Sequence, residues 1–276
     1  MMKTDERTLP SHNRTGLSAF LSARADKLLS FGALFVCCAV LTALRCRQLS
    51  TEQGGSACVV ITVCSAAVMI LLSLRARNNF RPALRYGMLS VTFGASVSAG
   101  LLLVAIGISV YYARFAAHPV SDVNAVVSFL VKLFALLSAV AFLATSALES
   151  ISKRVTLHLL LTLPPIFFCS LRVLNTFINS STLPLAESGG YRVLGMIAAM
   201  LFFLNEGKLL LGVKSTLAYQ ITGFSAAIFC AAYDLPLLIA GVRDGGYRPE
   251  AAYSLLTVGL VAYILTRIAT LPAKEE

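Results

Sequence analysis

The sequence predicts an all-α, polytopic integral membrane protein, a helix bundle of about eight transmembrane helices with both termini in the cytoplasm. Three observations lead to this prediction. Of the 276 residues, 57% are apolar and 13% are charged, whereas soluble domains average about 45–50% apolar and about 25% charged residues. The apolar residues gather in runs of about 20, the length that crosses a bilayer. Basic residues separate the runs. This pattern excludes a soluble enzyme, a disordered chain and a secreted disulfide scaffold.

The first apolar run follows a basic segment. Residues 1–27 carry five basic side chains and are predicted to form a cytoplasmic arm, with a short interfacial helix over residues 16–27 as one option. The arm and the run together resemble a signal peptide. However, no small-x-small cleavage site follows, and Arg45 and Cys46 end the run. We therefore expect a retained first span.

The remaining apolar runs are separated by short loops, so we expect one bundle over residues 28–271 and a cytoplasmic tail at residues 272–276. In the third run, Ser90, Gly94 and Ser98 recur at four-residue steps, a spacing that lets helix backbones approach closely. The eight predicted spans cover roughly residues 28–45, 57–74, 87–112, 124–148, 155–178, 191–212, 216–240 and 250–270.

The basic residues predict the orientation. With the amino terminus inside, 15 of the 23 lysines and arginines fall on the cytoplasmic side, Arg267 among them, and six fall on the opposite side. Such a bias is typical of cytoplasmic loops, so the net charge of +10 needs no nucleic-acid partner. The densest basic loop is an orientation signal, with binding of anionic lipid headgroups as the alternative. Its arginines are Arg75, Arg77, Arg81 and Arg85.

Five titratable residues lie inside the predicted spans, where a charge costs about 2.5–3.5 kcal/mol on insertion scales. They are our candidates for a substrate or ion pathway: Lys132, His158, Arg172, Glu206 and Asp234. At a rise of about 1.5 Å per residue, Lys132, Arg172 and Asp234 share a layer about 10 Å below the outer surface. Glu206 and His158 form a second layer nearer the cytoplasm.

Three prolines fall within two of these spans. Pro164 and Pro165 lie near the middle of the fifth span, and Pro236 follows Asp234 in the seventh. A proline inside a helix removes a backbone hydrogen bond and usually kinks the chain. Broken helices beside charged residues mark binding sites in transporters, although many membrane prolines only bend a helix.

The sequence leaves two functions open. The charged layers favour a small-solute permease or permease subunit with a polar pathway among spans 4–7, in the cytoplasmic membrane of a bacterium. The alternative is a non-transporting scaffold or sensor, in which Asp234 neutralises Arg172 as a structural ion pair. Either one can act as a homo-oligomer or beside a partner membrane subunit. We find no nucleotide-binding loop, no hydrolase or metalloprotease motif and no Cys/His cluster, and so expect no catalytic residue, cofactor or metal.

Overall fold

The computed structural model describes residues 12–51, 55–76, 89–115, 125–148, 155–179, 187–213, 215–243 and 249–271. These residues form eight α-helices and no strand. Each helix contains at least 18 consecutive residues that are apolar enough to cross a membrane. The prediction of an all-α, multi-pass membrane bundle is therefore confirmed. The helices are α1 (His12–Thr51), α2 (Gly55–Ala76), α3 (Leu89–Phe115), α4 (Ala125–Leu148), α5 (Val155–Asn179), α6 (Glu187–Leu210), α7 (Thr216–Arg243) and α8 (Pro249–Ala269).

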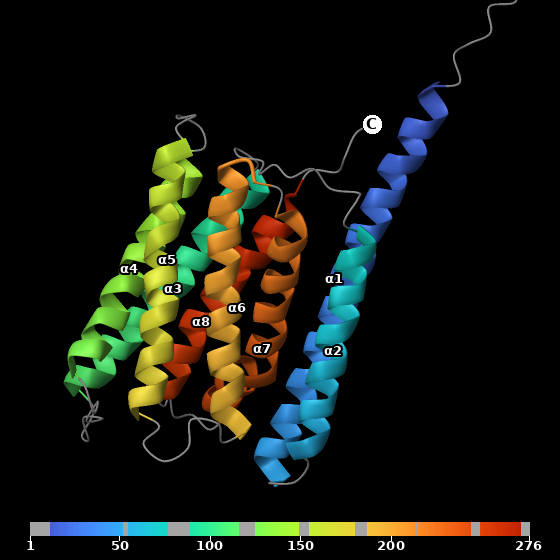
Figure 1. Cartoon of the computed structure of the whole chain (residues 1–276). Coiled ribbons are helices and arrows are strands. Elements are labelled where there is room, and N and C mark those ends of the chain that lie inside the picture. The colour runs from blue at the N-terminus through green and yellow to red at the C-terminus, as the bar shows by residue number, and fades with distance from the viewer. Residues whose placement is uncertain are drawn as a thin grey trace, which may run out of the picture.

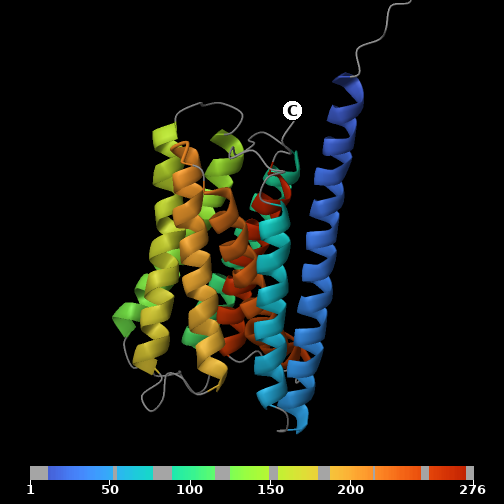
Figure 2. The same ribbon diagram turned by 45° about the vertical axis from the view of Figure 1, so that its right-hand side comes forward.

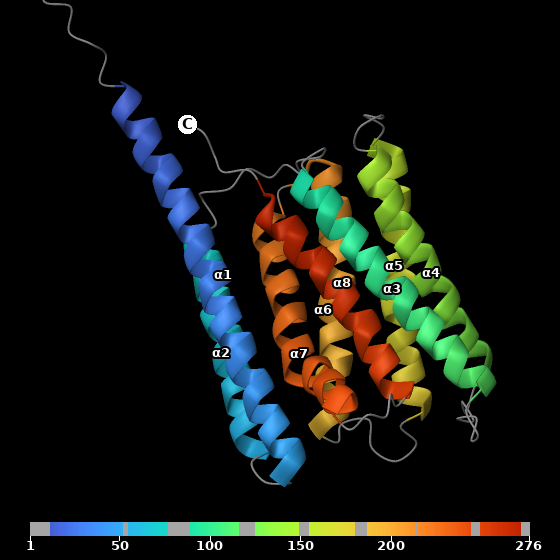
Figure 3. The same cartoon turned by 180° about the vertical axis from the view of Figure 1, so that it is seen from behind.

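Six of the helices form a closed ring. Each helix from α3 to α8 contacts the next one along the chain, and α8 closes the ring by packing against α3. Helix α8 also contacts α6 across the ring. The hairpin of α1 and α2 lies outside the ring and packs on α7 (Figures 1 and 3). Residues of α5, α6, α7 and α8 that face inward therefore meet in one interior.

Helix α8 is the most enclosed span, because 61% of its membrane segment is buried, against 17% for α1. Small residues permit this enclosure. A Cβ atom added to Gly94 on α3 would lie 2.3 Å from Cγ2 of Thr266, and one added to Gly223 on α7 would lie 2.3 Å from Cδ1 of Ile268. At Gly94 the Thr266 Cβ would lie 2.6 Å away, so α8 itself must move, whereas at Gly223 the Ile268 side chain must give way. The predicted close packing of the third span is thus found at Gly94.

The first span differs from its prediction. Helix α1 runs unbroken from His12 to Thr51, with an apolar segment at Ala25–Leu49 (Figure 2). There is no separate interfacial helix among the described residues, and residues 1–11 of the predicted arm lie outside them. The span does not end at Arg45, which is buried and donates a hydrogen bond from Nη1 to Oε1 of Gln48. A neighbour three residues along thus accepts from the guanidinium, and the helix continues past the charge.

Polar contacts tie the hairpin to the ring. Lys27 Nζ donates to the carbonyls of Ala269, at 3.1 Å, and Leu271, and Thr42 Oγ1 donates to the Ala231 carbonyl at 3.1 Å. The start of α1 and the end of α8 lie at the same end of the bundle, which we call the terminal end (Figure 1). Which side of a membrane this end faces stays a prediction.

Of the four arginines predicted to meet anionic lipid, one can be placed. Arg75 Nε lies 3.4 Å from Oδ1 of Asp26, and its side chain remains 69% exposed. Arg77, Arg81 and Arg85 lie outside the described residues. Arg75 thus links α2 to α1 at the terminal end and still presents its charge outward.

Candidate functional site

A buried ion pair lies near the terminal end of the ring. Arg267 Nε on α8 donates to Oε1 of Glu206 on α6 at 2.7 Å, and each side chain is only 2% exposed. The Tyr263 hydroxyl donates to the same oxygen at 3.4 Å. Two opposite charges in direct contact leave no net charge, so the pair is internally balanced. We define the Glu206 cluster as Glu206 and Arg267 with Tyr263, His158 on α5 and Thr145 on α4.

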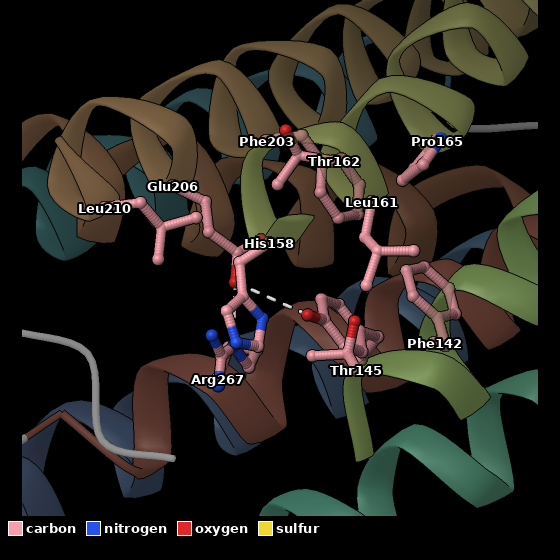
Figure 4. Close-up of a pocket in the computed structure, with 11 residues that line it drawn as sticks. Phe142, Thr145, His158, Leu161, Thr162, Pro165, Phe203, Glu206, Leu210 and Arg267 are labelled. Carbon is pink, nitrogen blue, oxygen red and sulfur yellow. Dashed lines mark hydrogen bonds and ion pairs between the residues drawn. The ribbon is translucent and has the colours of Figure 1, made fainter. Parts of the chain in front are cut away.

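The Glu206 cluster encloses a small cavity. The cavity is lined by all five cluster residues, and Figure 4 shows His158, Glu206 and Arg267 around it. Its volume of about 10 Å³ is at the lower limit for one water molecule, which needs about 10–15 Å³ on the same measure. The cluster is therefore closed to any solute larger than water.

Aromatic rings lie one helical turn from this ion pair, toward the opposite end of the bundle. Phe142 of α4 stacks on Tyr263 with ring centroids 4.1 Å apart and planes at 9°. Phe203 of α6 lies 5.9 Å from Tyr263 and 6.1 Å from Phe142. These three rings, which we call the aromatic layer, share Tyr263 with the Glu206 cluster and fill the interior beside the ion pair.

A second group of charges lies near the end of the bundle opposite the termini. The Arg172 guanidinium on α5 is buried and lies over the Tyr253 ring of α8, 4.1 Å from its centroid. The Arg192 guanidinium on α6 lies 4.6 Å from the centroid of Tyr233 on α7. Each cation thus rests on the face of a tyrosine, a favourable electrostatic contact. We define the Arg172 cluster as Arg172, Arg192, Tyr233, Asp234 and Tyr253.

The charges of the Arg172 cluster are close together but not joined. Asp234 on α7 is 1% exposed and interacts electrostatically with both arginines. Yet Oδ1 of Asp234 and the Nε and Nη2 atoms of Arg172 and Arg192 have no hydrogen-bond partner among the described residues. The direct Asp234–Arg172 pair of the scaffold alternative is therefore not formed. Two cations and one anion leave one net positive charge in the cluster.

The two clusters lie on the same inner faces. Each of three helices carries one residue of the Glu206 cluster and one residue of the Arg172 cluster. The two residues are about 14 positions apart in the helix, which is about 21 Å and just under four turns. A separation of whole turns returns the chain to the same side of the helix. The pairs are His158 and Arg172 on α5, Arg192 and Glu206 on α6, and Tyr253 and Arg267 on α8.

The prolines do not break their helices. Helix α5 continues through Pro164 and Pro165, and α7 continues through Pro236. Because proline has no N–H, the carbonyl four residues earlier loses its helical donor. In α5 one such carbonyl belongs to Leu161, a residue that lines the small cavity together with Pro165. The Leu161 carbonyl therefore lacks its i+4 helical donor next to the Glu206 cluster.

The structure brings together four of the five predicted pathway residues, two in each cluster. Lys132 of α4 is half-buried and has no ion pair or hydrogen bond within the described part of the chain, so it does not join Arg172 and Asp234. Sequence reasoning missed the other six cluster residues, which are Thr145, Arg192, Tyr233, Tyr253, Tyr263 and Arg267. Both Arg192 and Arg267 lie near a span end, where the sequence explains a basic residue by sidedness. The signal that could have found the α8 residues is a polar stripe at helical spacing from Tyr253 through Thr257 to Arg267.

Neither cluster resembles a metal site. Among the residues that can be placed, no group of three or more His, Cys, Asp or Glu side chains could hold a metal ion. Comparison of the chain with protein families, with curated proteins and with solved structures gives no match. What the geometry establishes is a multi-pass membrane protein with two buried charged clusters in one helix ring.

Proposed function

We propose that the chain is a small-solute permease or permease subunit in the cytoplasmic membrane of a bacterium. The observation that carries this proposal is the alignment of the two charged clusters on the same faces of α5, α6 and α8. Their separation of about 21 Å spans most of a hydrocarbon core about 30 Å thick. Charges buried at such depth usually face a bundle interior or a solute path. In this proposal the chain has no catalytic residue of its own.

The proposed pathway runs among α4, α5, α6, α7 and α8, and so adds α8 to the predicted set of spans 4–7. Asp234 of α7 and the hydroxyl-bearing residues Ser254 and Thr257 of α8 face one another in it. The aromatic layer closes the path between the clusters, and the carbonyls freed by the prolines supply acceptors along it. On the terminal side, Arg75, Arg77, Arg81 and Arg85 would meet anionic headgroups.

One observation favours the second candidate, a non-transporting scaffold or sensor. The Glu206–Arg267 pair is in direct contact, and a paired charge can specify which helices meet without taking part in chemistry. In a scaffold the Arg172 cluster would have the same structural role. The two candidates therefore differ in whether water and solutes reach the interior between the clusters.

Native cysteines allow this difference to be measured. Cys169 and Cys230 are buried and lie one turn from Arg172 and Asp234, on the same helices. The other five cysteines would be replaced by serine or alanine. The reconstituted protein would then be treated with a charged, membrane-impermeant thiol reagent. A permease that opens the path exposes these thiols in a fraction of its molecules, so we expect slow but complete labelling of both.

The matched control keeps only Cys64, which lies on the exposed face of α2. In a bilayer that face contacts lipid, so the charged reagent should leave Cys64 unmodified. Labelling of Cys169 and Cys230 together with protection of Cys64 supports a water-accessible path. If all three thiols stay unmodified in a folded protein, the permease is excluded and the scaffold remains.

A further inference from the structure

The unpartnered atoms of the Arg172 cluster share a pattern. On both Arg172 and Arg192 they are Nε and Nη2. These two nitrogens form one edge of the guanidinium, where their N–H bonds point in the same direction. This is the fork that matches the two oxygens of a carboxylate in a bidentate contact. The cluster therefore contains two free edges of the same type.

Because a tyrosine ring covers a face of each guanidinium, the Nε–Nη2 edge is the part of each cation that remains able to donate hydrogen bonds. Tyr253 covers a face of the Arg172 guanidinium and Tyr233 covers a face of Arg192. A hydrogen bond of 3.1 Å between the Tyr253 hydroxyl and Ser128 of α4 fixes the first ring. Since stacking holds the guanidinium planes, the direction of each free edge is set before a ligand arrives, which lowers the entropic cost of binding.

The charge of the cluster limits the charge of its ligand. Two guanidinium groups and the Asp234 carboxylate leave one net positive charge, and a monoanion balances it. Inorganic phosphate carries between one and two negative charges at neutral pH and would over-compensate. Chloride has the right charge, but it accepts both N–H bonds of an edge at one atom, whereas a carboxylate offers a separate oxygen to each N–H. The combination of forked donors and one net charge fits a monocarboxylate, which pairs one negative charge with two oxygens.

We propose that the Arg172 cluster binds the carboxylate group of a small monocarboxylate through the Nε–Nη2 edges of Arg172 and Arg192. The ligand enters from the end of the bundle opposite the termini, since Arg192 near the start of α6 is half-buried whereas Arg172 is 2% exposed. This inference rests on the proposed function, because it names the substrate class of the proposed path.

The test uses the full chain in detergent with lactate as the probe, and reads the thermal unfolding temperature against ligand concentration. Lactate should raise this temperature in the parent protein, and phosphate and chloride should raise it less. Arg172→Lys keeps the charge but loses the fork, so the dissociation constant should rise about tenfold or more. Asp234→Asn removes the repelling carboxylate and should tighten lactate binding.

Two further variants keep the test decisive if substitution at Arg172 impairs folding. Arg192→Gln changes a half-buried side chain near a helix end and should weaken lactate binding about as much as Arg172→Lys. Arg243→Gln removes an exposed charge at the same end of the bundle and should leave binding unchanged. The proposal is overturned if lactate produces no shift in the parent, if phosphate binds more tightly than lactate, or if Arg192→Gln and Arg243→Gln behave alike.

Uptake of radiolabelled lactate into proteoliposomes separates this inference from the proposed function. Saturable binding that depends on Arg192, without uptake, supports the binding site and contradicts the permease. Uptake that is unchanged by Arg192→Gln and Arg172→Lys supports the permease and overturns the assignment of this cluster as its carboxylate site.

Discussion

The Glu206 cluster and the Arg172 cluster use similar residue types on shared helices, yet their charges are arranged in opposite ways. In the first, Arg267 and Glu206 are in contact at 2.7 Å and their charges cancel. In the second, the arginine edges and Asp234 Oδ1 have no partner within the described residues, and one positive charge remains. Burial of a charge therefore does not define its role. The role depends on whether the fold itself supplies the counter-charge.

The largest expected effect comes from breaking the balanced pair. Glu206→Gln leaves the Arg267 guanidinium buried without a counter-charge, and we expect a loss of about 3–5 kcal/mol in the free energy of unfolding. Denaturant unfolding in detergent measures it. The double variant Glu206→Gln with Arg267→Gln should recover most of the loss, because it removes both charges together.

The matched change in the other cluster should behave differently. Arg172→Gln removes a buried cation that has no counter-charge in direct contact, and it leaves Arg192 and Asp234 with balanced charges, so stability should change by less than about 1 kcal/mol or increase. The comparison between the clusters fails if Arg172→Gln is as destabilising as Glu206→Gln in the same assay.

An intermediate effect is expected where α8 packs, because α8 contributes to both clusters. In Gly94→Ala the new methyl group would lie 2.3 Å from Thr266 Cγ2, so α8 must shift, at a cost of about 1–3 kcal/mol. Thermal unfolding of this variant is compared with that of Gly107→Ala, whose methyl group meets no atom within 4 Å. Gly107→Ala should be neutral or slightly stabilising, by up to about 1 kcal/mol. Equal losses in the two variants would show that α3 and α8 do not constrain each other.

A small effect is expected from separating the tyrosine hydroxyl from its ring. Tyr253→Phe removes the hydrogen bond to Ser128 and should cost about 0.5–1.5 kcal/mol, while the ring still lies over Arg172. Lactate affinity should then stay within about twofold of the parent, since the cation–π contact depends on the ring face. Calorimetric titration measures it, and a large loss in Tyr253→Phe would assign the ligand contact to the hydroxyl instead of the arginine edges.

The sequence was sufficient to predict the helices but not to predict which buried charged side chains contact one another. Apolar runs of about 20 residues identify spans because a bilayer demands that length. They misplace the end of α1, because Arg45 is accommodated by Gln48 within the same helix. Arg267 could not be distinguished from a sidedness residue, since its partner Glu206 lies 61 residues away in the chain. Lys132 and Arg172 were grouped because they lie at similar depths in the membrane. Contact also requires that their side chains point to the same side of the bundle, which depth along a helix does not show.

The packing of the α1–α2 hairpin on α7 has a consequence for biosynthesis. The hairpin is complete when residue 76 has been made, but its partner α7 begins at Thr216. At about 5–20 residues per second, the roughly 140 intervening residues take about 7–28 seconds to translate. During that interval the hairpin sits in the membrane without its docking surface, where a chaperone or a quality-control protease can reach it. The first helices made therefore gain their packing surface only when α7 has been made.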